Sequence, residues 1–313
     1  MSRAFIFPGQ GSQAVGMGKE LADNFVAARE VFQEVDEALS QNLSKLMWEG
    51  PLEDLTLTEN AQPAIMAVSV AVARTLEKQG GFKLADKASF VAGHSLGEYS
   101  ALAAAGAFNL ADTARILKLR GQAMQRAVPV GEGAMAVLLG LEFDAAAEVA
   151  AEAAQGEVCT AANDNGGGQV VVSGVKAAVD RAIEIAKTKG AKRSMLLPVS
   201  APFHCPLMQP AADEMQAALA GMTINAPSVP LVANVTASRV ADPDTIRTLL
   251  VEQVTGMVRW RESVIYMAEQ GVTSFAEIGA GKALTGMVKR IAKEAEASAI
   301  GTPADVETFL TSL

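Results

Sequence analysis

The segment Gly93-His94-Ser95-Leu96-Gly97 has the residue types and the spacing of a nucleophile elbow, G-x-S-x-G. A short apolar run precedes it and a helical run follows, as a strand–turn–helix elbow requires. The turn is so sharp that larger side chains two residues before or after the serine would clash. The serine lies at a helix N-terminus, where the next backbone N–H and the helix dipole can help to hold an oxyanion. The pattern predicts Ser95 as an acyl-carrying nucleophile.

A serine hydroxyl is a weak nucleophile at neutral pH, and histidine is its usual general base. The chain has two histidines. His94 adjoins Ser95, and adjacent side chains diverge at a sharp elbow, so it is poorly placed to take the proton. His204 lies in a stretch with prolines at positions 198, 202 and 206, which predicts a rigid loop and no long helix. We therefore expect His204 to be the base, the alternative being a buried structural histidine.

Three other motifs compete with this interpretation. The segment from Gly9 to Ala14 fits the dinucleotide pattern G-x-G-x-x-A, but no second strand ending in an acidic residue follows about 20 positions later. Gly281-Lys282 lacks both the earlier glycine and the Ser/Thr of a P-loop. Cys205 beside His204 is interpreted as an ordinary buried cysteine. Neither a nucleotide fold nor a cysteine nucleophile is expected.

Composition narrows the class of protein. The chain has 313 residues, of which 50% are hydrophobic and 19% charged, so it can bury a large core. At this length we expect one large domain and one smaller domain. The net charge of −9 gives no general attraction to nucleic acid or to an anionic membrane. The apolar stretches are too short for a membrane span or a signal peptide. Two cysteines without metal-ligand spacing suggest a reducing compartment. We expect a cytoplasmic protein without metal or cofactor.

Alternating strand-like and helix-like segments predict an α/β protein with a mostly parallel sheet. The helix-period spacing of apolar residues predicts a core helix over Pro63–Gln79. The expected strands of the large, α/β-hydrolase-like domain are Phe5–Phe7, Ser89–Ala92, Val229–Val235 and Thr273–Ile278.

Residues 131–198 have a strand–helix–strand–strand–helix–strand order of their own, which is the ferredoxin-like signature. Glycines precede this stretch and Pro198 ends it, which suggests an inserted subdomain with both ends joined to the large domain. We therefore predict a large catalytic domain over residues 1–130 and 199–313, and a small ferredoxin-like subdomain over 131–198.

With these motifs in hand, the chain resembles the malonyl-CoA:acyl carrier protein transacylases of bacterial fatty-acid synthesis over essentially its whole length. The resemblance rests on several separate motifs: Phe7-Pro8-Gly9-Gln10-Gly11-Ser12-Gln13, the elbow extended to Glu98-Tyr99, Leu119-Arg120-Gly121, Asn163-Asp164-Asn165 and Phe203-His204.

The resemblance implies that Ser95 takes malonyl from malonyl-CoA with His204 as base and acid, and that the phosphopantetheine thiol of acyl carrier protein then receives it. It implies an oxyanion hole made by the backbone N–H groups of Gln10 and Leu96. It also implies that the backbone carbonyl of Gln253 orients the histidine, where related hydrolases use an acid.

In this resemblance Arg120 grips the free carboxylate of malonate, which favours malonyl over neutral acetyl groups. Phe203 stands where some bacterial members have serine, and its ring would crowd branched acyl groups. Met124 and Asn163 are the remaining substrate-binding positions. Ala280 stands where proline is expected, away from proton transfer.

An acidic carrier protein needs a local basic surface, for which the candidates are Lys192-Arg193, Lys282 and Lys289-Arg290. Three alternatives stay open: a serine esterase or thioesterase, an acyltransferase that serves a polyketide synthase, and a non-catalytic docking module. The intact nucleophile argues against the last of these.

Overall fold

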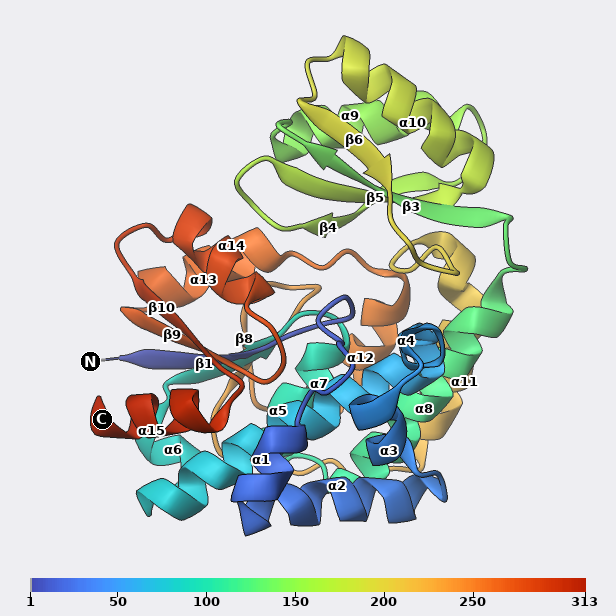
Figure 1. Ribbon diagram of the computed structural model, residues 1–313. Helices are drawn as coiled ribbons and strands as arrows, with labels where there is room; N and C mark the ends of the chain where they lie inside the picture. The colour runs from blue at the N-terminus through green and yellow to red at the C-terminus, as the bar shows by residue number, and fades with distance from the viewer. Residues whose placement is uncertain (1) are drawn as a thin grey trace.

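The computed structural model describes residues 2–313, which form two sheets with helices packed on each (Figure 1). Sheet A contains six strands. In spatial order they are β10 (Glu296–Ile300), β9 (Ser274–Ile278), β1 (Arg3–Phe7), β2 (Phe90–Gly93), β7 (Leu231–Val232) and β8 (Arg239–Val240). The first five run parallel to one another, and β8 alone is antiparallel, pairing with β7. Sheet A is therefore mostly parallel, as predicted.

Helices cover both faces of sheet A, because alternate side chains of each strand point to opposite faces. Phe5 and Phe7 belong to the larger hydrophobic core on one face, and Ala4 and Ile6 to a smaller core on the other. The larger core is built with α1 (Lys19–Asn24), α2 (Val26–Leu39), α3 (Leu43–Glu49), α4 (Leu52–Thr56), α5 (Thr58–Gly80), α6 (Leu84–Lys87), α7 (Leu96–Ala104), α8 (Leu110–Ala127), α11 (Gln209–Ala220), α12 (Pro243–Thr255) and α15 (Pro303–Thr311). The smaller core is built with α13 (Trp260–Glu269) and α14 (Ala283–Ile291).

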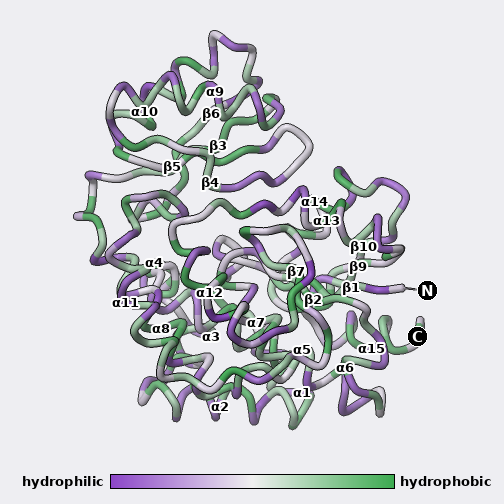
Figure 2. Tube along the Cα trace, turned by 180° about the vertical axis from the view of Figure 1, so that it is seen from behind, coloured by the Kyte–Doolittle hydropathy of each residue, from purple (hydrophilic) through white to green (hydrophobic). Residues whose placement is uncertain are grey.

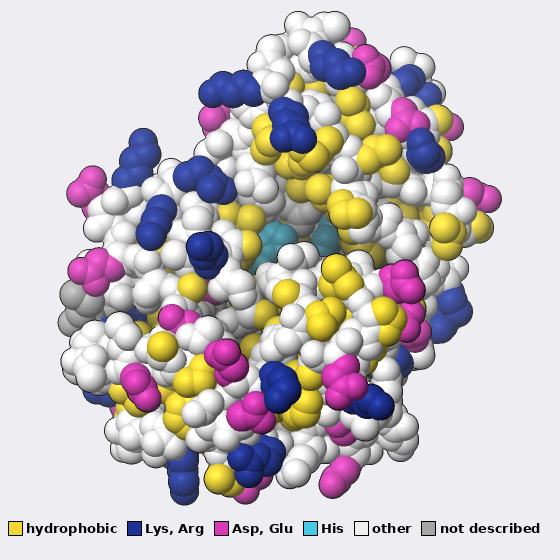
Figure 3. Space-filling model, viewed as in Figure 1, with side chains coloured by type: hydrophobic (Ala, Val, Ile, Leu, Met, Phe, Trp, Pro, Cys, Tyr) yellow, Lys and Arg dark blue, Asp and Glu magenta, His cyan; other side chains and the backbone are white. Residues whose placement is uncertain are grey.

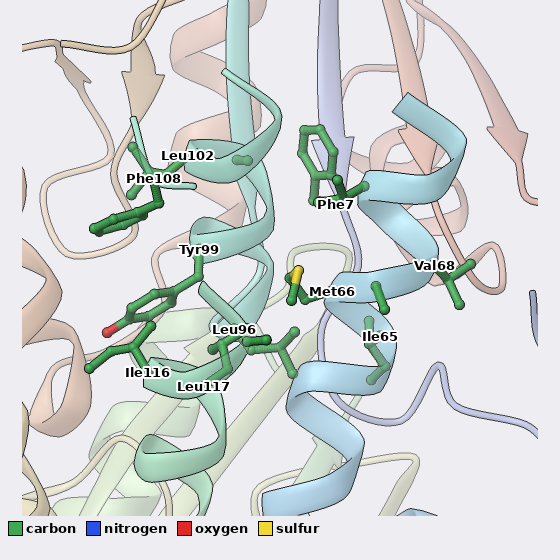
Figure 4. Packing of buried hydrophobic residues seen from close by; sticks show 14 of the residues in the cluster. Phe7, Ile65, Met66, Val68, Leu96, Tyr99, Leu102, Phe108, Ile116 and Leu117 are labelled. Atoms are coloured by element: carbon green, nitrogen blue, oxygen red, sulfur yellow. The ribbon is translucent and has the colours of Figure 1, made fainter. Parts of the chain in front are cut away.

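The centre of the larger core lies directly behind the elbow. Met66 of α5, Leu96 and Tyr99 of α7, and Leu117 of α8 are all buried and lie in one cluster (Figure 4). Burying each such side chain contributes roughly 1.5–3 kcal/mol to folding. The helix that begins at the elbow is thereby held rigidly against its neighbours.

Sheet B is antiparallel and forms a second part of the molecule. Its spatial order is β4 (Cys159–Asp164), β5 (Gln169–Val175), β3 (Gly133–Leu139) and β6 (Arg193–Leu196). The helices α9 (Phe143–Ala154) and α10 (Lys176–Thr188) cover one face and make a separate core with Ala136, Leu138 and Val172. In the view from behind, β3 and β5 are coloured mostly as hydrophobic (Figure 2). The part of the molecule that contains sheet B stands apart from sheet A in the same view. The domain boundaries at 130/131 and 198/199 stay a prediction.

The opposite face of sheet B turns toward the large part. Met135 and Val137 of β3 and Val171 of β5 belong to the larger core, whereas their neighbours along each strand belong to the small one. The period-2 alternation of these strands therefore serves two cores at once.

Two element predictions were wrong in detail. Helix α5 begins at Thr58, five residues before the predicted start, and Pro63 lies inside it. Pro63 is the sixth residue of α5, so its missing N–H costs one intrahelical hydrogen bond, which the burial of α5 in the larger core offsets. The strand predicted over Val229–Val235 contains only Leu231–Val232, because the chain turns back at Ala233 to pair β7 with β8.

The remaining predicted strands, Phe5–Phe7, Ser89–Ala92 and Thr273–Ile278, correspond to β1, β2 and β9. None of the helices within residues 2–313 combines the length and the apolar character needed to cross a membrane.

Candidate active site

The elbow is a tight turn between β2 and α7. Ser95 stands at the N-terminal end of α7 with φ 54° and ψ −112°, a strained conformation for a residue with a side chain. A Cβ atom on Gly93 would collide with the backbone of Gly97, and one on Gly97 would collide with the carbonyl of Phe7. Both glycines of the motif are therefore required by close backbone approach, as the sequence predicts.

The Ser95 hydroxyl lies in hydrogen-bond contact with His204. The Oγ–Nε2 distance is 2.8 Å, and the imidazole Nδ1 lies 2.9 Å from the Gln253 carbonyl oxygen and 3.1 Å from that of Gly256. Carbonyl oxygens only accept hydrogen bonds, so Nδ1 carries the proton and Nε2 accepts from the serine. His204 is therefore set as a proton acceptor toward Ser95.

Burial controls the charge of His204. The ring is 4% exposed, and burial together with the nearby Arg120 cation lowers the pKa of His204 to about 3, although the bond to the Gln253 carbonyl opposes the shift. At neutral pH the imidazole is uncharged and can take a proton. It will hold that proton better once an anion offsets Arg120.

Arg120 is a buried cation whose three hydrogen-bond acceptors are uncharged. Its guanidinium donates to Gln62 Oε1 (2.7 Å), Gln253 Oε1 (2.8 Å) and Ser95 Oγ (3.2 Å), and it is 1% exposed. A buried charge is costly unless an opposite charge or strong hydrogen bonds compensate it. Arg120 thus gives the site an affinity for an anion within reach of Ser95.

Side-chain amides behind the elbow were not predicted. Asn234 accepts from the Ser95 backbone N–H (2.8 Å) and donates to the Gly93 carbonyl (2.7 Å), and so fixes the turn. The Gln253 side chain donates to the Ser95 carbonyl (3.0 Å) and to Glu98 (2.6 Å). Asn234 lies two residues after the end of β7, so its place at the carboxyl end of a parallel strand was the one available signal. Gln253 was predicted for its carbonyl alone.

The backbone N–H groups of Gln10 and Leu96 are the candidate oxyanion donors. Leu96 is the first residue of α7, where an N–H has no intrahelical acceptor. Within residues 2–313 neither N–H has a hydrogen-bond partner. The Gln10 side chain is held by Thr58 Oγ1 at 2.9 Å, which ties the loop after β1 to α5.

Ser95, His204 and Arg120 open into one cavity of about 490 Å³. The two histidines lie at the bottom of a hollow between the two parts of the molecule (Figure 3). The other predicted substrate-binding side chains, Met124, Asn163 and Phe203, line the same cavity, as do Gln10 and Leu96. Gln253 lies behind it, against His204 and Arg120. The structure thus brings every predicted site residue together, and the role of each is a proposal.

His94 has a different partner. Its Nε2 lies 2.9 Å from Asn165 Oδ1, and burial lowers its pKa while that hydrogen bond opposes the shift. Within residues 2–313 no group of three or more His, Cys, Asp or Glu side chains is arranged to hold a metal ion.

The strand–elbow–helix with this serine and histidine matches a known class. A family model described as "Acyl transferase domain" matches residues 4–308, so the chain belongs to the acyl transferase family and is an acyltransferase. Within that family it groups with the malonyl CoA-acyl carrier protein transacylases.

The chain is 47% identical to the malonyl CoA-acyl carrier protein transacylase of Escherichia coli K12, over 98% of each chain. A crystal structure of an acyl-carrier-protein-S-malonyltransferase from Bartonella henselae is 56% identical, with a TM-score of 0.97 over 100% of this chain and 99% of that one. A malonyl-transacylase in complex with a type II PKS acyl-carrier protein is 42% identical, with a TM-score of 0.97 over 100% of both chains.

Proposed function

We propose that the protein transfers a malonyl group from malonyl-CoA to the phosphopantetheine thiol of acyl carrier protein by a ping-pong mechanism through a malonyl-Ser95 intermediate. One observation carries this proposal: a serine–histidine pair 2.8 Å apart shares a cavity with a buried arginine whose acceptors are all uncharged. The names of the relatives supply the two thiols between which the acyl group moves.

In the first half-reaction His204 Nε2 takes the Ser95 hydroxyl proton as Oγ attacks the thioester carbonyl. The N–H groups of Gln10 and Leu96 stabilise the oxyanion, with the positive end of the α7 dipole behind them. The protonated His204 then gives its proton to the departing CoA thiolate. In the second half-reaction the carrier thiol loses its proton to His204 and attacks the malonyl ester, and the protonated His204 then gives that proton to the departing Ser95 Oγ.

Two carbonyl oxygens hold the proton on His204 Nδ1, where a Ser-His-Asp hydrolase uses a carboxylate. A neutral carbonyl stabilises an imidazolium less than a carboxylate does. A thioester is activated and its thiol leaves easily, so the weaker base suffices for thiol-to-thiol transfer. This feature favours a thioester substrate over the ester of a serine esterase, and the lifetime of the acyl-enzyme in water distinguishes a transferase from a thioesterase.

Arg120 selects the acyl group. A planar guanidinium can bind the free carboxylate of malonyl through two parallel hydrogen bonds, a contact that acetyl lacks. Phe203 is 8% exposed and lines the cavity beside His204, where its ring restricts branched acyl groups.

Intact-mass spectrometry after mixing with malonyl-CoA, and then with holo carrier protein, tests the reaction. We expect a malonyl adduct on Ser95 that persists in buffer and disappears on addition of the carrier, and no adduct on Ser95→Ala. Rapid loss of the adduct to water would support a hydrolase. Transfer to a fatty-acid carrier compared with a polyketide carrier distinguishes the two pathways.

The carrier surface is proposed on the rim of the hollow. Lys and Arg side chains gather over α13 and α14 and on the adjoining edge of the smaller part (Figure 3). The cations proposed for this surface are Lys192, Arg193, Lys282, Lys289 and Arg290, and within residues 2–313 none of them forms an ion pair. They are thus available to an acidic partner.

The paired substitution Lys192→Glu, Arg193→Glu tests this surface. We expect a higher KM for carrier protein and a weaker salt dependence, with the KM for malonyl-CoA unchanged. The matched control is Lys45→Glu, Lys78→Glu, two exposed lysines on α3 and α5 away from the rim. If the Lys192→Glu, Arg193→Glu variant kept the wild-type transfer rate and salt dependence, these two residues would not belong to the carrier-binding surface.

Two further expectations belong to this proposal. The β-α-β-β-α-β order of β3 to β6 and their spatial order support a ferredoxin-like subdomain over residues 131–198, inserted into an α/β-hydrolase-like domain. The fatty-acid or polyketide role proposed for the reaction fits a cytoplasmic location.

A further inference from the structure

Glu98 is a buried ionisable group that the proposed reaction does not use. It lies in the first turn of α7 and is 1% exposed. Its Oε2 accepts from Gln253 Nε2 (2.6 Å) and from the Asn234 N–H (3.3 Å). Its Oε1 is buried and has no hydrogen-bond partner within residues 2–313.

One amide connects Glu98 to Arg120. Gln253 Oε1 accepts from the Arg120 guanidinium at 2.8 Å, while its Nε2 donates to Glu98. The hydrogen bonds thus run in one direction, from the cation through the amide to the carboxyl group. Both charged groups are fully buried, where Coulomb interactions are screened far less than in water.

The charges around Glu98 are few. Arg120 of α8 is the cation that acts on it, and Tyr99, on its own helix, has a pKa raised by burial to about 12 and stays neutral. Gln253 from α12 and Asn234 from the segment after β7 are uncharged, and His204 is neutral above its lowered pKa. The charge balance of this network therefore depends on Glu98, on Arg120 and on what binds Arg120.

A carboxylate bound to Arg120 would set two carboxyl groups against one cation in a buried site. Like charges that share a buried site raise the pKa of one of them. Glu98 can accept that proton on Oε1 without breaking either hydrogen bond at Oε2. Burial already raises the pKa of Glu98 to about 7, so little further shift is needed near neutral pH.

We propose that Glu98 takes up one proton from solvent when a carboxylate-bearing acyl group binds Arg120, and releases it when that group leaves. Glu98 then acts through Arg120 and touches no substrate, so it is a specificity-determining residue and not a catalytic one. The inference rests on the proposed function, because it requires a charged acyl group at Arg120.

The ratio of kcat/KM for malonyl-CoA to that for acetyl-CoA, measured between about pH 6 and 9, tests the proposal. Dividing by the acetyl value removes the titrations of Ser95, His204 and CoA. In the wild type we expect the ratio to fall above about pH 7, approaching tenfold per pH unit, because one proton is linked to binding. In Glu98→Gln, whose amide mimics the protonated carboxyl group, we expect a flat ratio.

The matched control is Glu277→Gln. Glu277 is also buried, but its two oxygens bind donors at the start of α14, so this variant should keep the wild-type slope. A flat ratio in the wild type, or the same slope in Glu98→Gln, would overturn the proposal. A purely structural role for Glu98 would lower both kcat/KM values and leave the slope.

Calorimetry provides a second measurement if Glu98→Gln folds poorly. Titrating Ser95→Ala with malonyl-CoA in two buffers of different ionisation enthalpy counts the protons bound. At about pH 8 we expect uptake approaching one proton with malonyl-CoA and none with acetyl-CoA, and equal values would refute the coupling. Absence of malonyl transfer by the wild type would refute the proposed function, whereas transfer with a flat ratio refutes this inference alone.

Discussion

Two strand–turn–helix units of sheet A end at the same edge of the sheet and differ in how the helix begins. One runs from β2 through the elbow into α7, and the other from β9 through Gly279-Ala280-Gly281 into α14. In the second, Glu277 accepts from the backbone N–H groups of Leu284 (3.1 Å) and Thr285 (2.7 Å) and so closes the helix N-terminus. In the first, the Leu96 N–H has no partner within residues 2–313.

A helix N-terminus with an unpaired N–H group can bind an anion from outside the chain. Unpaired N–H groups and the helix dipole favour an anion at that end, and the chain's own carboxylate satisfies them in α14. In α7 the nearby carboxyl group, Glu98, accepts from Gln253 and leaves the Leu96 N–H free. Substitutions in the β2–α7 unit should therefore change activity more than stability, and those in the β9–α14 unit the reverse.

The largest expected effect is at Ser95. Ser95→Ala and Ser95→Gly should each reduce kcat by roughly 10⁴-fold or more, because no acyl group can be carried. At φ 54° glycine is unstrained and alanine is not, so the glycine variant should be more stable than the alanine variant by about 1 kcal/mol. Urea unfolding of the pair measures the strain, and a less stable glycine variant would contradict it.

The next effect is at Arg120. Arg120→Ala should lower kcat/KM for malonyl-CoA by roughly 1,000-fold, the loss of two charge-assisted hydrogen bonds, with a much smaller change for acetyl-CoA. Steady-state kinetics with both thioesters measures the preference. An unchanged malonyl-to-acetyl preference would mean that Arg120 does not bind the carboxylate of the acyl group.

The next prediction is a pH dependence of stability that comes from Glu98. The raised pKa of Glu98 means that the folded state binds more protons than the unfolded state between about pH 4.5 and 7. This contribution to stability is present at low pH and is lost as the pH rises through about 7. From pH 4.5 to 8 the free energy of unfolding of the wild type should fall, relative to Glu98→Gln, by at most about 3 kcal/mol. Parallel curves from denaturant titrations would contradict it.

The smallest effect is at Glu277. Glu277→Gln places an amide N–H against a helix N–H and should destabilise the protein by about 2 kcal/mol. The kcat with saturating malonyl-CoA should not change, because Glu277 bonds only α14. A loss of activity without a loss of stability would break the comparison between the two units.

The sequence predicted those parts of the site that depend on local spacing. The elbow is encoded within five residues, and the proline-rich loop of His204 within nine, so both could be recognised without tertiary structure. The alternation of strand-like and helix-like segments along the chain likewise predicted the α/β class. Residues that meet from separate elements carried no such signal.

Gln62 on α5, Asn234 after β7 and the Gln253 side chain on α12 converge on Ser95 and Arg120 only in the folded chain. Uncharged amides have no periodic pattern and are common on surfaces, so composition could not distinguish them. The early start of α5 has a related reason: Pro63 favours a helix start, and the tertiary hydrogen bonds of Thr58 to Gln10 and of Gln62 to Arg120 override that preference.

The walls of the cavity come from both parts of the molecule. Ser95 and Arg120 belong to the part with sheet A, whereas Met135 and Asn163 lie on strands of sheet B, whose helices pack on a separate core. The reacting atoms and part of the cavity wall thus come from different sheets, although Met135 also packs in the larger core. A lineage, or an engineer, could reshape that wall for a different cargo while inheriting the nucleophile unaltered.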